Sequence, residues 1–239
     1  YLNIKKEDPK WEDRDRFILS KGHAGIAYAP VLCDFGYNDP EQLKTFNLTN
    51  SKMGIHLDSN KVAGVDASTG SLGHGIPIAA GTAIAARVLG KDYYTYVVTG
   101  DGELDEGSNW EGLMTIRHYN LTNCITIVDR NHCMIDGNTE DVMKLEPLAD
   151  KFVAFGFHTI VCEGNNIVSL CKAIDEAHKT KDKPTVIVAD TIKGVGIKLT
   201  SGNYKWHYGA IDEEMAKVAA KDLDEYSAER IARCGKEFE

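Results

Sequence analysis

Tyr94–Thr99 (YTYVVT) runs directly into Gly100-Asp101-Gly102, and this junction sets the fold class of the chain. The next apolar run, Cys124–Asp129 (CITIVD), ends in polar residues in the same way, and helical spacing of large apolar residues over Glu106–Tyr119 separates the two. Short β-branched runs separated by helices of ten or more residues are typical of a parallel sheet covered on both faces. The pattern therefore predicts an α/β fold with a doubly wound, mainly parallel sheet.

The remaining elements extend this alternation in both directions. Strands are predicted at Phe17–Leu19, His158–Cys162 and Thr185–Asp190, and helices at Ala24–Phe35, Gly75–Leu89, Pro147–Phe155, Ile167–Lys179 and Asp212–Ala232. Gly75–Leu89 is so apolar that it predicts a buried helix, whereas the mixed charge of the last helix predicts packing on the outside. We expect one domain over 1–239, with a helical region at 1–92, an α/β core at 93–192 and an extension at 193–239.

Composition excludes several classes of protein. The chain has 239 residues, of which 43% are hydrophobic, and a formal net charge of −9, so no basic stripe is available for nucleic acid. Its apolar runs are too short or too interrupted to span a bilayer, and no secretory signal is visible. The sequence begins with Tyr1, which predicts that an upstream segment is missing.

Cysteine spacing points to free thiols. The six cysteines contain no Cys-x-x-Cys pair, and several lie inside apolar runs: Cys33, Cys124, Cys133, Cys162, Cys171 and Cys234. Buried free thiols are therefore favoured over disulfides or a zinc site, and a reducing cytoplasm is the expected location.

Asp101 and Asn131 follow the ends of two successive predicted strands. Their side-chain oxygens are hard ligands that suit Mg²⁺ or Ca²⁺ holding a diphosphate. A dinucleotide site is disfavoured because the third glycine of its motif is absent. Glu103, Asp105 and Glu106 would also repel a bare pyrophosphate, whereas they tolerate one neutralised by metal.

Other candidate residues have both structural and functional interpretations. Thr69–Gly75 is a glycine-rich loop that suits either close helix packing or a ligand pressed against the backbone. His23, His56 and His207 lack zinc-ligand spacing, so they are structural or lie near an anionic ligand. Glu106 and Glu111 lie five residues apart and are either surface acids or pocket residues.

Taken in order, these motifs resemble the transketolase family over nearly the whole chain. The resemblance is carried by Ser20-Lys21-Gly22-His23-Ala24, Ser68–Gly75 (STGSLGHG), Gly100–Gly107 (GDGELDEG), Asp129-Arg130-Asn131, Ile135-Asp136-Gly137, Lys183-Pro184-Thr185, Lys193-Gly194-Val195-Gly196 and Trp206-His207. The chain is similar to the thiamine-diphosphate-binding half, as in the N-terminal subunit of a split transketolase. That resemblance implies transfer of a two-carbon ketol unit from a ketose phosphate to an aldose phosphate.

The resemblance also implies a role for each matching residue. Mg²⁺, with Ca²⁺ or Mn²⁺ as substitutes, would be held by Asp101, Asn131 and the backbone carbonyl of Cys133. Contacts with thiamine diphosphate are implied for His23, Gly70, Leu72, Gly102, Glu103, Asn131, Ile135 and His207. Catalytic roles are implied for His23, for His56 beside the donor sugar, and for Glu106 and Glu111 in a carboxylate network that links paired active sites.

The resemblance has departures from the family pattern. An upstream Gly-His-Pro-Gly segment of the family is not in this sequence, and His74 stands where the family carries glutamine. The pyrimidine-binding domain and its ring-protonating glutamate are also absent. We therefore expect a C-terminal partner chain, a homodimer of this subunit within a heterotetramer, and no turnover by this chain alone.

Two other functions stay open on the sequence. A 1-deoxyxylulose-5-phosphate synthase would share the fold and metal motif but would use pyruvate as donor. A non-catalytic scaffold subunit could have kept the fold, although intact Asp101, Asn131, His23 and His207 argue against it. The identity of the sugars is beyond what the residues indicate.

Overall fold

A computed structural model describes residues 1–237 of the chain, with side chains described as far as residue 232. Its centre is a five-stranded sheet in which every neighbouring pair is parallel, in the order β1-β2-β3-β5-β4. The strands are β1 (Arg16–Leu19), β2 (Thr95–Gly100), β3 (Cys124–Arg130), β4 (His158–Glu163) and β5 (Thr185–Asp190). The predicted parallel α/β sheet is confirmed.

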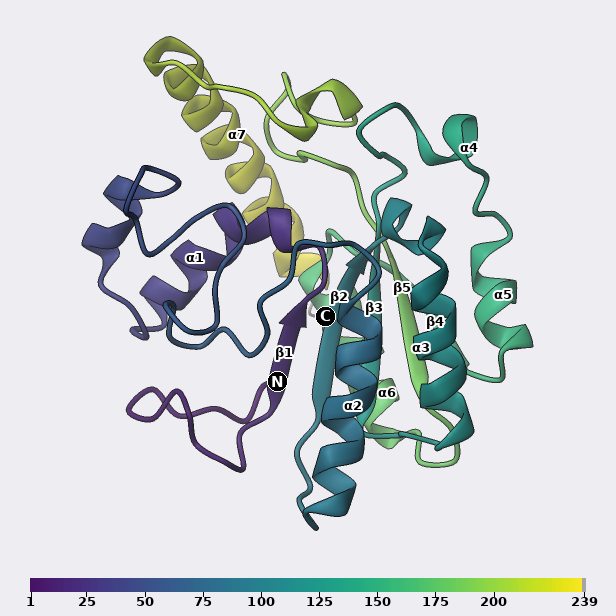
Figure 1. Cartoon of the computed structure of the whole chain (residues 1–239). Helices are drawn as coiled ribbons and strands as arrows, with labels where there is room; N and C mark the ends of the chain where they lie inside the picture. Colours follow the sequence, from purple (N-terminus) through teal and green to yellow (C-terminus); the bar gives the residue numbers. More distant parts are fainter. Residues whose placement is uncertain (238–239) are drawn as a thin grey trace.

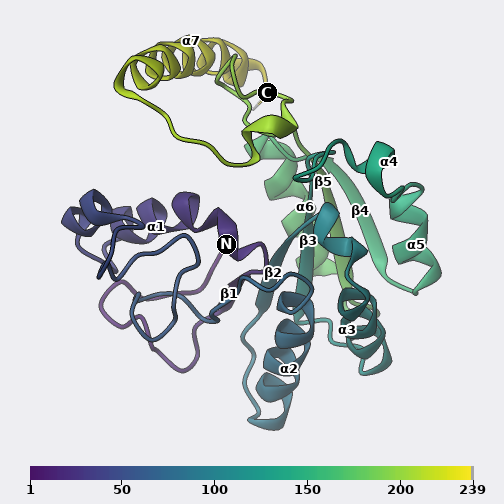
Figure 2. The ribbon, with the colours of Figure 1, turned by 45° about the horizontal axis from the view of Figure 1, so that its top comes forward.

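Helices cover both faces of this sheet (Figures 1 and 2). The α-helices are α1 (Gly25–Asp34), α2 (Gly75–Val88), α3 (Gly107–His118), α4 (Thr139–Val142), α5 (Leu148–Ala154), α6 (Ile167–Lys179) and α7 (Glu213–Glu237). Short 3₁₀ turns are η1 (Gly22–Ala24), η2 (Pro40–Thr45), η3 (Gly102–Asp105) and η4 (Tyr204–His207). Each predicted helix is present, with boundaries shifted by a few residues at most.

Three clusters of buried side chains hold the layers together. On one face, α2, α3 and α5 pack on the sheet through residues such as Ile76, Leu113 and Phe152. On the other face, α6 packs on Ile125 and Ile187. A third cluster, at Ala29, Leu32, Cys33, Met53, Leu57 and Val62, joins α1 to the loop that precedes α2.

Because all strands run the same way, their carboxyl ends lie along one edge of the sheet. In register, Gly100 of β2 lies opposite Asp129 of β3, which in turn lies opposite Ala189 of β5. The loops that follow these strands therefore meet at that edge, where ligands bind in open α/β sheets.

Some expectations about burial need correction. Helix α2 is buried on one face only, because Ile78 is 37% exposed and Val88 is 78% exposed. Among the cysteines, Cys33, Cys124 and Cys133 are buried free thiols, but Cys162 and Cys171 are only half-buried. The side chain of Cys234 lies outside the described residues. The strand predicted at Phe17–Leu19 is confirmed as β1, which lies within the first 92 residues that were otherwise expected to be helical.

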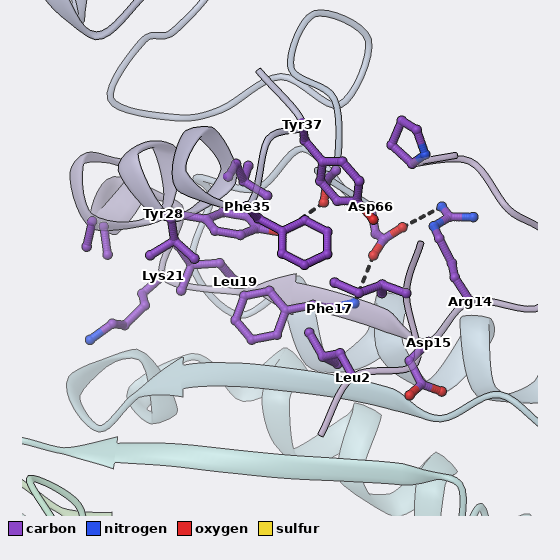
Figure 3. Close-up of a pocket in the computed structure, with 17 residues that line it drawn as sticks. Leu2, Arg14, Asp15, Phe17, Leu19, Lys21, Tyr28, Phe35, Tyr37 and Asp66 are labelled. Carbon is purple, nitrogen blue, oxygen red and sulfur yellow. Dashed lines mark hydrogen bonds and ion pairs between the residues drawn. The ribbon is translucent and has the colours of Figure 1, made fainter. Parts of the chain in front are cut away.

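The sheet edge at β1 carries an apolar cavity of about 470 Å³ between β1 and α1 (Figure 3). Asp66 closes the outer edge of β1, because its carboxylate accepts a hydrogen bond from the Phe17 N–H at 2.8 Å and pairs with Arg14 at 2.5 Å. Lys21 also lines this cavity, but its ammonium points away from the aromatic side chains (Figure 3). Within the described residues, no helix has the length and apolar character needed to cross a membrane.

Candidate functional site

Loops after β1, β2, β3 and β5 form the candidate site at the carboxyl edge of the sheet. The parallel register brings the residues after Gly100 and those after Asp129 side by side. Asp101 and Asn131, thirty residues apart in the sequence, are thereby carried on adjacent loops. The sequence-based expectation that these loops are neighbours is confirmed.

Asp101 is held in the interior by three donors. Its Oδ2 accepts from Arg130 Nη1 at 2.9 Å and from the His132 N–H at 2.6 Å, and its Oδ1 accepts from the Gly102 N–H at 2.8 Å. Burial raises the pKa of Asp101, and the bonds from Arg130 and from the two backbone N–H groups oppose that rise. Oδ2 is thus occupied by protein donors, whereas Oδ1 keeps a lone pair for a ligand.

Asp129 orients the Asn131 amide. One oxygen of Asp129 pairs with Lys21 and accepts the Asn131 side-chain N–H at 3.1 Å, and the other accepts the Thr191 hydroxyl. Burial alone would raise the pKa of Asp129, but the Lys21 charge and these hydrogen bonds outweigh it and lower the pKa. With its nitrogen fixed on Asp129, the Asn131 amide turns its oxygen toward the Cys133 N–H, 3.1 Å away.

Four basic side chains lie beside the carboxylates of Asp101 and Asp129. They are Lys21, His23, Lys193 and His207. The rings of His23 and His207 have centroids 5.1 Å apart, and Lys193 Nζ lies 3.5 Å from His207 Nδ1. Burial, followed by the neighbouring His207 and Lys21, lowers the pKa of His23 to about 4. Burial and the adjacent cations also lower the pKa values of His207 and Lys193. Half-buried basic groups that suppress one another's charge are typical of a site built for an anion.

Glu103 lies beneath this site and not on its surface. Glu103 is only 3% exposed. One of its carboxylate oxygens accepts hydrogen bonds from Ser20 and Gly73, and the other accepts from Thr99 and Gly100. Each oxygen is saturated by two protein donors. The structure therefore does not favour the predicted direct contact between Glu103 and a cofactor, and gives this carboxylate contacts with the loops instead.

The glycine-rich loop packs against two predicted site residues. A Cβ on Gly70 would lie 2.9 Å from Cδ2 of His56, so the structure brings the exposed His56 ring onto this loop. Gly73 has φ +87°, and a Cβ there would lie 2.7 Å from Cβ of Glu106. Leu72, between these glycines, is half-buried. The close packing of the loop is therefore confirmed, while a ligand pressed against its backbone stays a prediction.

The other predicted residues lie at the rim of the site or outside it. Ile135, in the loop after β3, is 56% exposed. A Cβ on Gly102 would lie 3.1 Å from Cβ of Met134, so this loop presses on the Gly-Asp-Gly turn. Glu106 and Glu111 are exposed at the start and on the outer face of α3. The structure does not bring these two acids into the cluster of Asp101, and their roles stay predictions.

Several residues of the site were missed as individual candidates. Lys21, Lys193, Asp129, Arg130 and Thr191 all contact predicted ligands or one another. Four of them lie within the motifs that carry the resemblance to transketolase: Lys21, Lys193, Asp129 and Arg130. Their places in these motifs could have identified them from the sequence. Thr191 had no such signal, because the register of β3 and β5 alone places it beside Asp129.

The donor set fits a diphosphate held through a hard cation. Asp101 Oδ1, Asn131 Oδ1 and the Cys133 carbonyl supply oxygens of the kind Mg²⁺ prefers, and the four basic groups match a diphosphate. No hydrogen bond to the Cys133 carbonyl is found among residues 1–237. The Gly102 N–H, predicted to contact the diphosphate, donates to Asp101 and would have to exchange that partner. Residues 1–237 contain no cluster of three His, Cys, Asp or Glu side chains able to hold a metal.

The comparisons with known proteins all identify the same family. The family model described as the thiamine-diphosphate-binding domain of transketolase matches residues 1–228. An apulose-4-phosphate transketolase subunit from Actinobacillus succinogenes is 39% identical over 226 residues, which cover 93% of this chain and 82% of that protein. The 6-deoxy-6-sulfo-D-fructose transketolase subunit SqwG of a Clostridium species is 37% identical, covering 95% of this chain and 82% of that protein.

Solved structures agree with these matches. Transketolase from Campylobacter jejuni superposes with a TM-score of 0.85 at 30% identity, covering 93% of this chain and 36% of that chain. The Leishmania mexicana enzyme gives a TM-score of 0.83 at 33% identity, covering 97% of this chain and 39% of that one. The chain thus spans less than two-fifths of these enzymes but most of the two transketolase subunits. With the parallel sheet, the Asp101–Asn131 pair and the basic cluster, these matches show that the chain belongs to the transketolase family and forms its thiamine-diphosphate-binding domain.

Proposed function

We propose that this chain is the N-terminal subunit of a two-chain transketolase that moves a two-carbon ketol unit from a ketose phosphate to an aldose phosphate. The observation that carries the proposal is the coverage of its relatives. The chain spans 82% of two proteins that are named as transketolase subunits, but only 36% and 39% of the two transketolase chains compared above. A pyrimidine-binding partner chain and a homodimer of this subunit, together a heterotetramer, complete the proposed enzyme.

Each part of the site has a task in this reaction. Asp101, Asn131 and the Cys133 carbonyl would hold Mg²⁺, while Lys21, Lys193, His23 and His207 would bind the diphosphate. When bound, thiamine diphosphate supplies the electron sink that lets a carbon–carbon bond beside a carbonyl break. Arg130 keeps Oδ2 of Asp101 occupied, so Oδ1 is the oxygen left for the cation.

The histidines would assist the sugar at the open side of the site. His56 is exposed beside Gly70, where its ring can donate to a hydroxyl or carbonyl oxygen of the donor sugar. The low pKa of His23 keeps its imidazole neutral at pH 7, so it can serve as an acceptor or a donor. The contacts of Gly70, Leu72 and Ile135 with the cofactor rings, and the acidic network of Glu106 and Glu111, belong to the same proposal.

Calorimetry and a reconstituted assay test the proposal. We expect the isolated chain to bind thiamine diphosphate weakly with Mg²⁺ and to turn over nothing until the pyrimidine-binding chain is added. Asp101→Ala should abolish the binding heat, whereas Asp190→Asn, at an exposed acid at the end of β5, should leave it unchanged. Absence of heat with the wild type, with or without the partner, would favour the scaffold function instead.

The identity of the donor sugar would define the activity of the enzyme more closely. The subunit relatives above are named for apulose 4-phosphate and for 6-deoxy-6-sulfo-D-fructose, so branched and sulfonated ketoses belong in the donor panel beside pentose phosphates. Turnover of pyruvate but not of ketoses would point to a deoxyxylulose-phosphate synthase. The free thiols at Cys33, Cys124 and Cys133 support a reducing location such as the cytoplasm.

A further inference from the structure

We propose that Glu103 is a positioning residue that locks three loops of the cofactor site together through one buried carboxylate. The inference rests on the proposed function, because the loops are those that would hold the cofactor. It assigns to Glu103 a role that acts through its neighbours and not through contact with the ligand.

The geometry shows four donors converging on this carboxylate. Oε1 accepts the Ser20 hydroxyl and the Gly73 N–H at 3.0 Å. Oε2 accepts the Thr99 hydroxyl at 2.8 Å and the Gly100 N–H at 3.2 Å. Because two carboxylate oxygens offer about four lone-pair positions, this set leaves none open to a metal or a cofactor.

The donors come from three separate segments that each lead to a predicted ligand. Ser20 begins the turn that carries His23, Gly73 lies in the glycine-rich loop, and Gly100 begins the Gly-Asp-Gly turn that carries Asp101. One side chain therefore fixes the relative position of parts of the site that are up to eighty residues apart in the sequence. Such coupling is the function of a supporting residue around a binding site.

The same carboxylate reaches the start of α2 through Ser20. The Ser20 Oγ accepts the Gly75 N–H at 3.1 Å while its own hydroxyl donates to Glu103. A negative charge near the first turn of a helix is favourable, because the unpaired N–H groups there carry partial positive charge. Glu103 thus places a negative charge near the first turn of α2, with the Ser20 hydroxyl between them.

Only a carboxylate can satisfy this arrangement. Each oxygen receives one hydroxyl, which could turn around, and one backbone N–H, which could not. In Glu103→Gln the amide NH₂ must face either the Gly73 N–H or the Gly100 N–H, and two donors cannot bond each other. Whichever way the amide turns, one of the loops is released.

Hydrogen exchange of the cofactor-free chain is the first test. We expect Glu103→Gln to accelerate amide exchange in peptides covering 69–75 or 99–102. The matched control is Asp15→Asn, because Asp15 is a buried carboxylate, 6% exposed, that accepts the Asn3 and Tyr94 N–H groups near the amino ends of the strands. That control should leave exchange at both site loops unchanged. Thr99→Val removes one hydroxyl donor with little change of shape, and supplies a milder variant if Glu103→Gln does not fold.

Cofactor affinity is the second test. With Mg²⁺ present, Glu103→Gln should weaken thiamine diphosphate binding about 10- to 100-fold, as loss of a supporting residue does, and Thr99→Val should weaken it less. Unchanged affinity and unchanged loop exchange in Glu103→Gln would overturn the inference. So would an equal loss of affinity in Asp15→Asn, which would show a general effect of stability. If the wild type binds no cofactor, the proposed function fails, while the exchange experiment still decides the role of Glu103.

Discussion

Arg130 Nη1 lies 2.9 Å from Oδ2 of Asp101, and both side chains are buried, 3% and 1% exposed. The same guanidinium also bonds the Thr139 hydroxyl and the carboxylates of Glu140 and Glu146. The predicted metal ligand is thus tied to the loop after β3 by one cation. Breaking a buried pair costs more than forming it gains, because the partner is left as an uncompensated charge.

Arg130→Leu tests this relationship. We expect it to lower the free energy of unfolding by about 3–5 kcal/mol, since Asp101 would remain buried without its cation. Urea unfolding followed by circular dichroism measures the loss. Lys44→Gln, which removes an exposed pair with Glu41, should cost less than about 1 kcal/mol. Adding Asp101→Asn to Arg130→Leu should restore part of the stability, and equal unfolding midpoints for Arg130→Leu and Lys44→Gln would contradict the prediction.

Asp129→Asn tests the orientation of the Asn131 amide. Without the carboxylate, Lys21 loses its partner and the Asn131 amide is no longer held with its oxygen toward the Cys133 N–H. Mg²⁺ affinity, titrated calorimetrically at saturating thiamine diphosphate, should fall about 10- to 100-fold, as is usual for loss of a residue that orients a ligand. Asp190→Asn is the comparison, and it should change the affinity less than about twofold because its pair with His132 is exposed.

The pH dependence of stability should reflect the protonation of the half-buried His23. Its pKa is about 4 in the folded chain and 6.5 in its unperturbed state. Well above pH 6.5 the imidazole is neutral in both states, so its contribution is constant there. As the pH falls from 6.5 to 4, the unfolded chain takes up a proton that the folded chain does not, and stability is lost. Because His23 is half-buried, we expect a loss of about 1–2 kcal/mol after solvent screening.

His23→Gln provides the check on this window. Its unfolding free energy should fall less steeply between pH 6.5 and 4 than that of the wild type, and the two profiles should run parallel above pH 7. An unchanged slope in the variant would assign the pH dependence to other groups. Binding of a diphosphate anion should raise the pKa of His23, so the chain should take up protons when the anion binds. Calorimetry in two buffers with different ionisation enthalpies measures this proton uptake.

Gly22→Ala tests the close approach of two site loops. A Cβ at Gly22 would lie 2.5 Å from the Thr69 carbonyl oxygen, so the backbone would have to move apart. We expect a loss of about 1–3 kcal/mol, together with weaker cofactor binding. Gly81→Ala is the matched control, because no atom lies within 4 Å of a Cβ at that helical position. It should stabilise the chain by about 0.5–1 kcal/mol, and thermal unfolding that ranks the two variants the other way would refute this account.

Much of the fold was accessible from local sequence patterns. Thr185–Asp190 and Ile167–Lys179 have the predicted boundaries, because a short β-branched apolar run and a period-3.6 pattern are both local signals that span only a few residues. The exposure of Ile78 and Val88 on α2 was not accessible, since composition does not show which face meets the sheet. The order β1-β2-β3-β5-β4 also depends on pairings between distant segments.

Residue types and spacing alone predicted that the Asp101 carboxylate and the Asn131 amide lie on adjacent loops, because the ends of successive parallel strands are brought to one edge of the sheet. Tertiary structure decided how those groups are used. It placed Arg130 on Asp101, and it brought Ser20 and Gly73 to Glu103. These partners lie up to eighty-three residues apart, and hydrogen bonds at such separation depend on how the loops pack, which no local periodicity encodes.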